Sequence, residues 1–215
     1  METIELNIYQ FSELSESVQK KLIEENRCIN VDDYDWYHNI FDEYTEKLEK
    51  EGFIEPKIHF SGFGSQGDGA CFDCNSIDID PFLKKMGIRS NLVMKIIKNN
   101  FKFTINKNDW GNRYSHEKTR YVDYYDQSIE NYFASPIFDH EKHPRVHKIV
   151  NKITNLLERT RVNYCKFIFK DLEKEFDFLT SDEEVTFQLN EDDLQYFKNG
   201  ASYPEDVVLV NEVTA

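Results

Sequence analysis

Four of the eight glycines of this chain lie within one stretch, residues 62–69. The stretch separates two segments in which apolar residues alternate with polar ones, Ile58 to Phe60 before it and Ala70 to Ile79 after it, as in half-buried strands. Glycine tolerates positive φ angles and lets another backbone or a ligand approach closely. The sequence therefore predicts two antiparallel strands joined by a sharply bent glycine loop.

The same loop carries groups that bind polar ligands. Ser65 supplies a hydroxyl, Gln66 an amide and Asp68 a carboxylate, while Gly67 and Gly69 leave the backbone accessible. The loop lacks the Lys-Ser/Thr ending of a P-loop and the strand-then-helix setting of a dinucleotide fingerprint. An elaborate hairpin turn explains these glycines equally well, so the loop alone leaves turn and binding site as two interpretations.

A second polar segment covers residues 113–117. It follows the turn-forming residues 108–112 and opens the return strand of a second predicted hairpin, whose strands are expected over 101–105 and 114–125. An arginine fork, a hydroxyl and a carboxylate together suit a phosphate or a cyclic nucleotide, and the alternative is a solvated strand with ordinary charge pairs. Alternation along a strand would place Arg113, Ser115 and Glu117 on one face and Tyr114, His116 and Lys118 on the other.

Helical periodicity occupies most of the remaining chain. We expect a helix after the N-cap Ser15, a second over 32–52, and one broken helix or two short ones over 82–99. A long apolar stripe over 146–176 indicates core or an oligomer seam, and Ser181 is the expected N-cap of a last short helix. Together these elements predict an α+β fold of two antiparallel strand pairs packed with four or five helices.

Composition indicates a folded protein of one domain. The 215 residues include 17 Phe and 12 Tyr, and 40% are apolar, which suits a globular core and not a disordered chain. No repeat, low-complexity tract or Pro/Ser-rich linker divides the sequence. We therefore expect a single α+β domain over 1–200, followed by a weakly held tail over 201–215.

Charge and cysteine content restrict the partners and the compartment. Forty acidic residues against 26 basic ones give a net charge of −14, which repels the phosphates of long duplex nucleic acid. The chain begins without a signal-peptide pattern, and no apolar stretch approaches the length of a membrane span, so we expect a cytoplasmic protein with no membrane contact. Four irregularly spaced cysteines predict no disulfide framework.

Neither a metal nor a cofactor is expected. Cys71 and Cys74 have metal-like spacing, but no second pair completes a tetrahedral set. The histidine-containing segment 140–147 lacks the His-Glu-x-x-His motif. No combination of nucleophile, base and orienting acid can be assigned, which favours a protein without catalytic activity.

Two motifs together resemble a family of small accessory proteins encoded by bacteriophages and prophages. The first is Phe-Ser-Gly-Phe-x-Ser-Gln-Gly-Asp-Gly-Ala-x-Phe over residues 60–72, and the second is Arg-Tyr-Ser-His-Glu over 113–117. The resemblance runs over residues 1–200. This chain departs from the family at Asn112, where members commonly carry glycine before the Arg-Tyr pair.

The family has no settled activity, but the resemblance implies a role in altering host physiology or blocking a bacterial defence inside the host cytosol. With the residue types, it predicts a protein that binds and neutralises a host factor, in particular a nucleotide-type immune signal. The alternatives are a nucleotide or phosphoester hydrolase that uses Asp68 and His116 as acid and base, and an acidic inhibitor or nucleic-acid mimic that blocks a host enzyme. Homo-oligomer formation stays open. The predicted ligand-binding residues are Ser65, Gln66, Gly67, Asp68, Gly69, Arg113, Ser115, His116 and Glu117.

Overall fold

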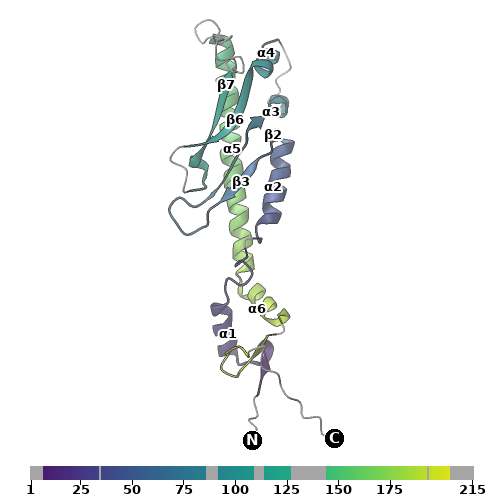
Figure 1. Cartoon of the computed structure of the whole chain (residues 1–215), viewed down its shortest axis with the longest axis vertical. Coiled ribbons are helices and arrows are strands. Elements are labelled where there is room, and N and C mark those ends of the chain that lie inside the picture. The colour runs from purple at the N-terminus through teal and green to yellow at the C-terminus, as the bar shows by residue number, and fades with distance from the viewer. Residues whose placement is uncertain are drawn as a thin grey trace. The chain divides into compact units, whose positions relative to one another are not determined.

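The protein has an α+β fold, as the sequence predicts, with six α-helices and four two-stranded antiparallel sheets among its described residues (Figure 1). The chain forms two compact units, Met1–Trp36 with Lys174–Ala215, and Tyr37–Glu173. Both ends of the chain thus belong to one unit, whereas the sequence, which carries no linker, predicts one domain over 1–200. The computed structural model describes residues 7–33, 35–85, 92–108, 114–126, 144–192 and 194–203.

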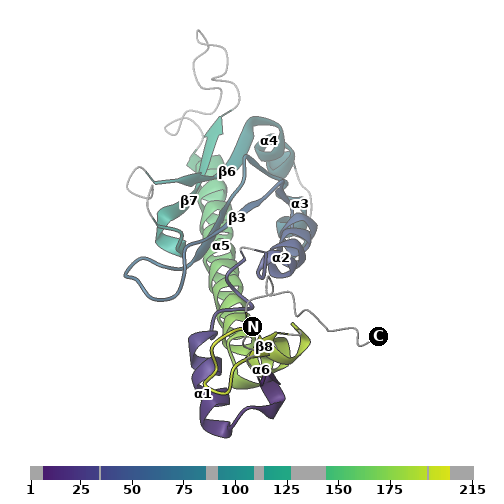
Figure 2. The same ribbon diagram turned by 60° about the horizontal axis from the view of Figure 1, so that its bottom comes forward.

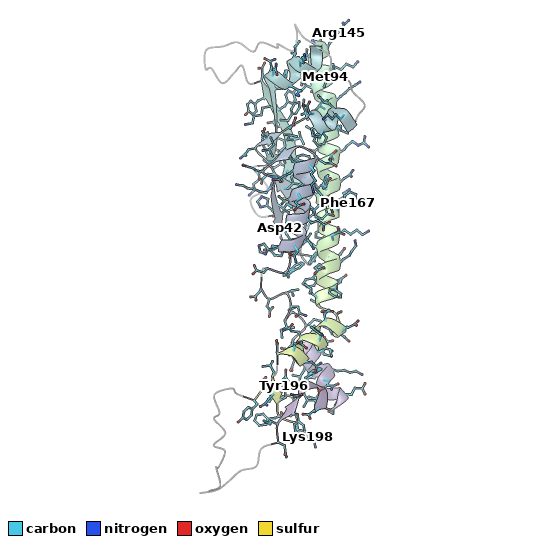
Figure 3. All side chains as sticks on the ribbon, turned by 90° about the vertical axis from the view of Figure 1, so that its right-hand side faces the viewer. Asp42, Met94, Arg145, Phe167, Tyr196 and Lys198 are labelled. Atoms are coloured by element: carbon cyan, nitrogen blue, oxygen red, sulfur yellow. The ribbon has the colours of Figure 1, made fainter. Side chains whose placement is uncertain are left out.

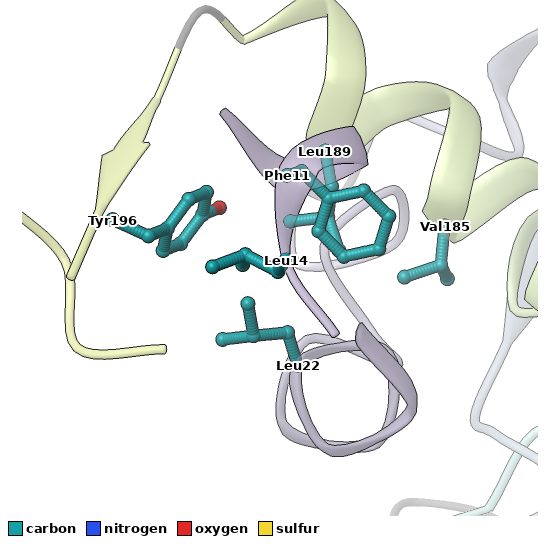
Figure 4. Close-up of a cluster of buried hydrophobic side chains, with 6 residues drawn as sticks. All are labelled: Phe11, Leu14, Leu22, Val185, Leu189 and Tyr196. Carbon is teal, nitrogen blue, oxygen red and sulfur yellow. The ribbon is translucent and has the colours of Figure 1, made fainter. Parts of the chain in front are cut away.

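The first unit joins the two ends of the chain through a short sheet and two helices. Strand β1 (Tyr9–Gln10) pairs antiparallel with β8 (Gln195–Tyr196), and the 3-10 helix η1 (Phe11–Glu13) leads to α1 (Glu16–Glu25), which begins after Ser15 as predicted. The last helix is α6 (Asp182–Glu191). Figure 4 shows the apolar side chains that meet between these elements, namely Phe11, Leu14, Leu22, Val185, Leu189 and Tyr196.

Polar contacts complete this unit around α6. The Ser181 hydroxyl accepts a hydrogen bond from the Glu184 amide at 3.2 Å, which confirms Ser181 as the N-cap. Arg27 pairs with Asp182 and donates to the Thr180 carbonyl oxygen at 3.0 Å. Of the predicted tail, Ser202 forms an isolated bridge with Tyr196, and residues 204–215 lie outside the described residues.

Both predicted hairpins are present in the second unit. Strand β3 (Lys57–Phe60) pairs antiparallel with β4 (Ala70–Asp73) across the glycine loop, and β6 (Phe101–Lys107) pairs with β7 (Arg120–Asp126). An antiparallel bridge between Cys74 and Ile105 links the two hairpins. A short pair that the sequence did not predict joins β2 (Phe53–Ile54) to β5 (Ser76–Ile77). The strands β3, β6 and β7 lie against the long helix of the unit (Figure 2).

That long helix, α5 (Pro144–Leu179), carries the predicted apolar stripe. Its buried positions recur every three or four residues, so they form one face that lies in the core of the unit. Figure 3 shows the strands and α2 on one side of α5, with the side chains of its opposite face extending away from them. The stripe therefore forms core. None of the described helices, α5 included, is apolar enough over a sufficient length to cross a membrane. The buried α5 residues are Val146, Val150, Ile153, Leu157, Arg161, Cys165, Ile168 and Leu172.

Three further helices complete the second unit, and one of them differs from its prediction. Helix α2 (His38–Lys50) stops before Gly52 as expected but begins later than Asp32 or Asp33. At this start the Phe41 amide donates to the Tyr37 carbonyl oxygen at 3.1 Å, and the Tyr37 ring packs on the Phe60 ring of β3, 6.0 Å away. The predicted helical region 82–99 holds α3 (Asp80–Lys85) and α4 (Leu92–Asn100), and residues 86–91 between them lie outside the described residues.

Candidate functional site

The glycine loop, residues 61–69, is held at its base by the sheet and by aromatic packing. The Ser61 amide donates to the Gly69 carbonyl oxygen at 3.2 Å, which extends the β3–β4 ladder into the loop. The Phe63 ring lies 4.9 Å from the Phe60 ring and 5.4 Å from the Phe169 ring on α5. One limb of the loop is therefore anchored to the core.

Asp68 closes the tip of the loop. Its Oδ2 accepts a hydrogen bond from the Ser65 amide at 2.6 Å, and its own amide donates to the Ser65 carbonyl oxygen at 3.0 Å. Aspartate commonly stabilises turns through such side-chain to backbone bonds. Asp68, which the sequence predicts as a ligand-binding group, thus has a structural role in this loop.

The other limb of the loop packs directly against the segment that follows residue 113. A Cβ atom on Gly67, whose φ is +102°, would lie 2.7 Å from Cδ1 of Tyr114, and one on Gly69 would lie 2.5 Å from Cβ of His116. No side chain fits at such distances, so glycine is required at both positions. The Ser115 amide also donates to the Ser61 hydroxyl at 3.3 Å. The two polar motifs of the sequence are therefore in contact.

The segment after residue 113 is not the strand that the sequence predicts. The return strand begins only at Arg120, and residues 117–119 form the 3-10 helix η2 (Glu117–Thr119). His116 caps this helix, because its Nδ1 accepts the Lys118 amide hydrogen at 3.1 Å and its carbonyl oxygen accepts from the Thr119 amide at 2.9 Å. The predicted division of side chains between two strand faces is therefore wrong, since it requires an extended backbone.

An open pocket of about 550 Å³ lies where the two motifs meet. The turn brings Tyr114, His116 and Lys118 to the same pocket as Glu117, which a strand would not do. Tyr114 and Lys118 were absent from the predicted ligand-binding set. Their only signal in the sequence is that they flank residues of that set. The described residues that line the pocket are Gln66, Gly67, Asp68, Tyr114, His116, Glu117 and Lys118.

The other predicted site residues have different places. Ser65 holds Asp68, Gly69 packs under His116, and the Ser115 amide binds Ser61, so these three support the pocket wall. Arg113 lies outside the described residues.

Some polar groups of the pocket already make hydrogen bonds within the protein, and others do not. Because Nδ1 of His116 accepts a hydrogen bond, the neutral ring carries its hydrogen on Nε2 and offers a donor there. Within the described part of the chain, no hydrogen bond reaches either carboxylate oxygen of Glu117, and Nδ1 of His116 lies 3.9 Å from Oε2 of Glu117. Lys118 is exposed. The pocket thus combines a free carboxylate, an ammonium group and an imidazole N–H.

A buried arginine on α5 holds the backbone of this wall. Arg161 is 1% exposed, and its guanidinium donates to the Glu117 carbonyl oxygen at 2.7 Å. It also donates to Oε2 of Glu158 at 3.0 Å, and the same oxygen accepts the Val122 amide hydrogen at 3.0 Å. Burial alone would lower the pKa of Arg161, but its pairing with Glu158 outweighs burial and raises that pKa. From the sequence, Arg161 was only part of the segment that carries the apolar stripe, and its polar role was not predicted.

A second ion network supports the other side of η2. Nε of Arg120, a residue only 4% exposed, lies 3.3 Å from Oδ2 of Asp73, and the same oxygen is 2.8 Å from Nε2 of His59. Arg120 also donates to the Thr119 carbonyl oxygen at 3.2 Å. Partial burial would raise the pKa of the Asp73 carboxyl, but His59 and Arg120 outweigh it and hold the pKa below its usual value.

Replacing Asp73 by asparagine is expected to destabilise the protein by about 1–3 kcal/mol at pH 7, because a charge-assisted hydrogen bond is lost on both sides. A lowered pKa means that the ionised form stabilises the fold. This stabilisation is complete above about pH 4 and disappears as the pH falls through the folded-state pKa. Urea unfolding of wild type and Asp73→Asn from pH 7 to pH 3 measures the difference, which should narrow below about pH 4.

The control for this series is Asp42→Asn, which changes an exposed carboxylate on α2. Its unfolding curves should follow those of wild type at every pH. A gap between wild type and Asp73→Asn that stays constant down to pH 3 would contradict the stabilising role of the Asp73 charge.

The three cysteines of this unit are internal. Burial raises the pKa of Cys71, that of Cys74 to about 11 and that of Cys165 to about 12, so all three thiols stay protonated at neutral pH. Among the described residues, no three His, Cys, Asp or Glu side chains are grouped so that they hold a metal ion.

The second unit is thus an α+β domain whose hairpin loop and adjoining 3-10 turn form one polar pocket. A family profile described as a domain of unknown function, DUF8835, matches residues 36–182. The chain belongs to this family, and the matched region contains the whole Tyr37–Glu173 unit and its pocket. No curated protein and no solved structure is significantly similar to the chain.

Proposed function

We propose that this protein is a phage-encoded accessory protein that acts in the host bacterial cytosol, where it sequesters a small nucleotide-type signal of an immune response. The observation that carries the proposal is the pocket at which the glycine loop meets residues 114–118. Its lining groups match the parts of a nucleotide: an aromatic ring for the base, and an ammonium group with an imidazole N–H for a phosphate. The resemblance to phage and prophage proteins supports the host setting.

The engagement of the polar groups favours binding over catalysis. A hydrolase that uses Asp68 and His116 needs a free lone pair on its general base. The basic nitrogen of the neutral His116 ring, Nδ1, accepts the Lys118 amide hydrogen and is therefore already used. Asp68 keeps unused lone pairs, but its Oδ2 accepts the Ser65 amide hydrogen and closes the loop. His116 is therefore not a free base, and a ligand that enters the pocket is expected to leave it unchanged.

Calorimetric titration of the purified protein with a panel of cyclic and linear nucleotides tests the proposal. We expect heat of binding for at least one member of the panel, and chromatography of the mixture should recover that nucleotide intact. If the folded protein gives no heat of binding with any nucleotide of the panel, nucleotide sequestration is overturned. Product formation that disappears in His116→Ala would identify a hydrolase instead. A host protein that binds in a salt-sensitive way without using the glycine loop would identify an acidic inhibitor.

Replacing Tyr114 by alanine is expected to weaken nucleotide binding roughly 5- to 150-fold, because stacking of a base on an aromatic ring contributes about 1–3 kcal/mol. The Tyr114 side chain lines the pocket and is 40% exposed, so a face of its ring is available to a ligand. The Tyr114→Phe variant keeps the ring and should retain most of the affinity. Calorimetry on both variants measures the effect.

Tyr121 provides the matched control, because it is also 40% exposed but lies on β7 and does not line the pocket. The Tyr121→Ala variant should bind as wild type does. An equal loss of affinity in both alanine variants would argue against stacking at Tyr114.

A further inference from the structure

We infer that the pocket selects guanine among the nucleobases and that Glu117 is the residue that recognises it. This inference rests on the proposed function, because it names the base of the nucleotide that the pocket would bind. It depends on the two carboxylates of the pocket, of which one is already used by the fold and the other is not.

Glu117 is the carboxylate that a ligand can use. The other carboxylate, on Asp68, accepts the Ser65 amide hydrogen at 2.6 Å and closes the loop. Both oxygens of Glu117 lack a hydrogen bond within the described chain, and its side chain is 32% exposed at the pocket wall. A carboxylate only accepts hydrogen bonds and pairs best with two adjacent donors. Its complement is therefore a planar group that presents two neighbouring N–H bonds.

Guanine alone among the common bases has such an edge, because its N1–H and its N2 amino group lie side by side on the Watson–Crick face. Adenine presents one donor beside one acceptor there, and cytosine does the same. Uracil presents a single donor between two acceptors. An acceptor-only carboxylate would face a ring nitrogen that is itself an acceptor in adenine and cytosine, and a carbonyl oxygen in uracil. Each of these contacts is unfavourable, so Glu117 discriminates against all three bases.

The fold holds the backbone of Glu117 in place before any ligand binds. Its carbonyl oxygen accepts from buried Arg161 at 2.7 Å, and η2 is capped by His116. The Tyr114 ring, which packs on Gly67, lines the same pocket and offers a stacking surface for the base. A fixed backbone and a fixed ring reduce the entropy lost on binding, which favours specific over loose association.

The test compares the affinities of guanosine, inosine and adenosine 5′-monophosphates by calorimetry. Wild type should bind the guanosine nucleotide about tenfold or more tightly than the adenosine nucleotide, as expected for one good bidentate pair. Inosine keeps N1–H but lacks the N2 amine, so its nucleotide should fall between the two. This comparison requires no variant and does not depend on how a substitution folds.

The Glu117→Gln variant then distinguishes recognition of the base by the Glu117 side chain from a purely structural role of this residue. Glutamine presents one acceptor and one donor, which matches the edge of adenine, so the preference for guanine should vanish or reverse while the overall fold is kept. Glu49→Gln, an exposed change on α2, is the control and should keep the wild-type preference. A role for Glu117 that is only structural would weaken all three nucleotides equally.

The outcomes separate this inference from the proposed function. Equal affinities of wild type for the guanosine and adenosine nucleotides would overturn guanine selection and leave nucleotide sequestration standing. A folded Glu117→Gln protein that still prefers the guanosine nucleotide as wild type does would also overturn recognition of guanine by Glu117. An absence of binding by every nucleotide of the broad panel would overturn both.

Discussion

Replacing Gly69 by alanine is expected to abolish ligand binding and to destabilise the protein by about 1–3 kcal/mol, the usual cost of forcing extra volume into a packed site. The added Cβ would lie 2.5 Å from Cβ of His116, 3.0 Å from its Cα and 3.2 Å from the Ser115 carbonyl oxygen. Two of these three atoms belong to the backbone and cannot rotate away. The loop and the turn must therefore separate, and the pocket loses one wall. Thermal unfolding and calorimetric titration measure the two effects.

Gly64 is the matched control for this variant. It lies in the same loop, but among the described residues no atom beyond its two chain neighbours lies within 4 Å of the position that its Cβ would take. The Gly64→Ala variant should unfold within about 0.5 kcal/mol of wild type and should bind ligand normally. If Gly69→Ala behaved as Gly64→Ala does, the close contact between the two motifs would be refuted.

Replacing Arg161 by methionine is expected to destabilise the protein by about 2–4 kcal/mol, which is the largest effect that we predict for a single substitution. The 38% exposure of the Glu158 side chain keeps this effect below the cost of a fully buried unpaired charge. The change removes the partner of the Glu158 carboxylate and leaves the Glu117 carbonyl oxygen without its donor at 2.7 Å. Methionine fills a similar volume, so the decrease in the free energy of unfolding comes mainly from lost polar contacts and less from lost packing. Urea unfolding followed by circular dichroism measures the change in the free energy of unfolding.

Two further variants control this experiment. Arg159 lies on the exposed face of the same helix, so Arg159→Met should change stability by no more than about 0.5 kcal/mol. Lysine lacks the planar fork that reaches Glu117 and Glu158 together, so Arg161→Lys should recover only part of the loss. A stability of Arg161→Met equal to that of wild type would show that the buried guanidinium contributes no net free energy.

The elements that could be predicted from the sequence are those specified by neighbouring residues. The glycine loop and both hairpins follow from alternation and from backbone freedom, and Ser181 as a helix cap follows from local hydrogen bonding. The start of α2 at His38 was missed, because the local pattern does not contain the contact of the Tyr37 ring with Phe60 of β3. Helix-start signals at Asp32 and Asp33 describe a tendency that packing overrides.

The candidate site was predictable in its location but not in its roles. Both motifs were recognised, and five of the predicted residues line the pocket, namely Gln66, Gly67, Asp68, His116 and Glu117. The sequence assigned Asp68 and Glu117 the same role as ligand groups. The fold separates them, because Asp68 binds the Ser65 amide whereas Glu117 accepts no hydrogen bond from the described chain.

By itself, the sequence determined an α+β chain with a glycine loop between two strands, helices that end at local signals, and two polar motifs. These features depend on φ angles, capping and periodicity, which act over a few residues. Only the tertiary structure decided that the two motifs meet, that residues 117–119 form a turn and not a strand, and that Arg161 is buried behind them. These outcomes arise from contacts between residues far apart in the chain, whose energies no local pattern contains.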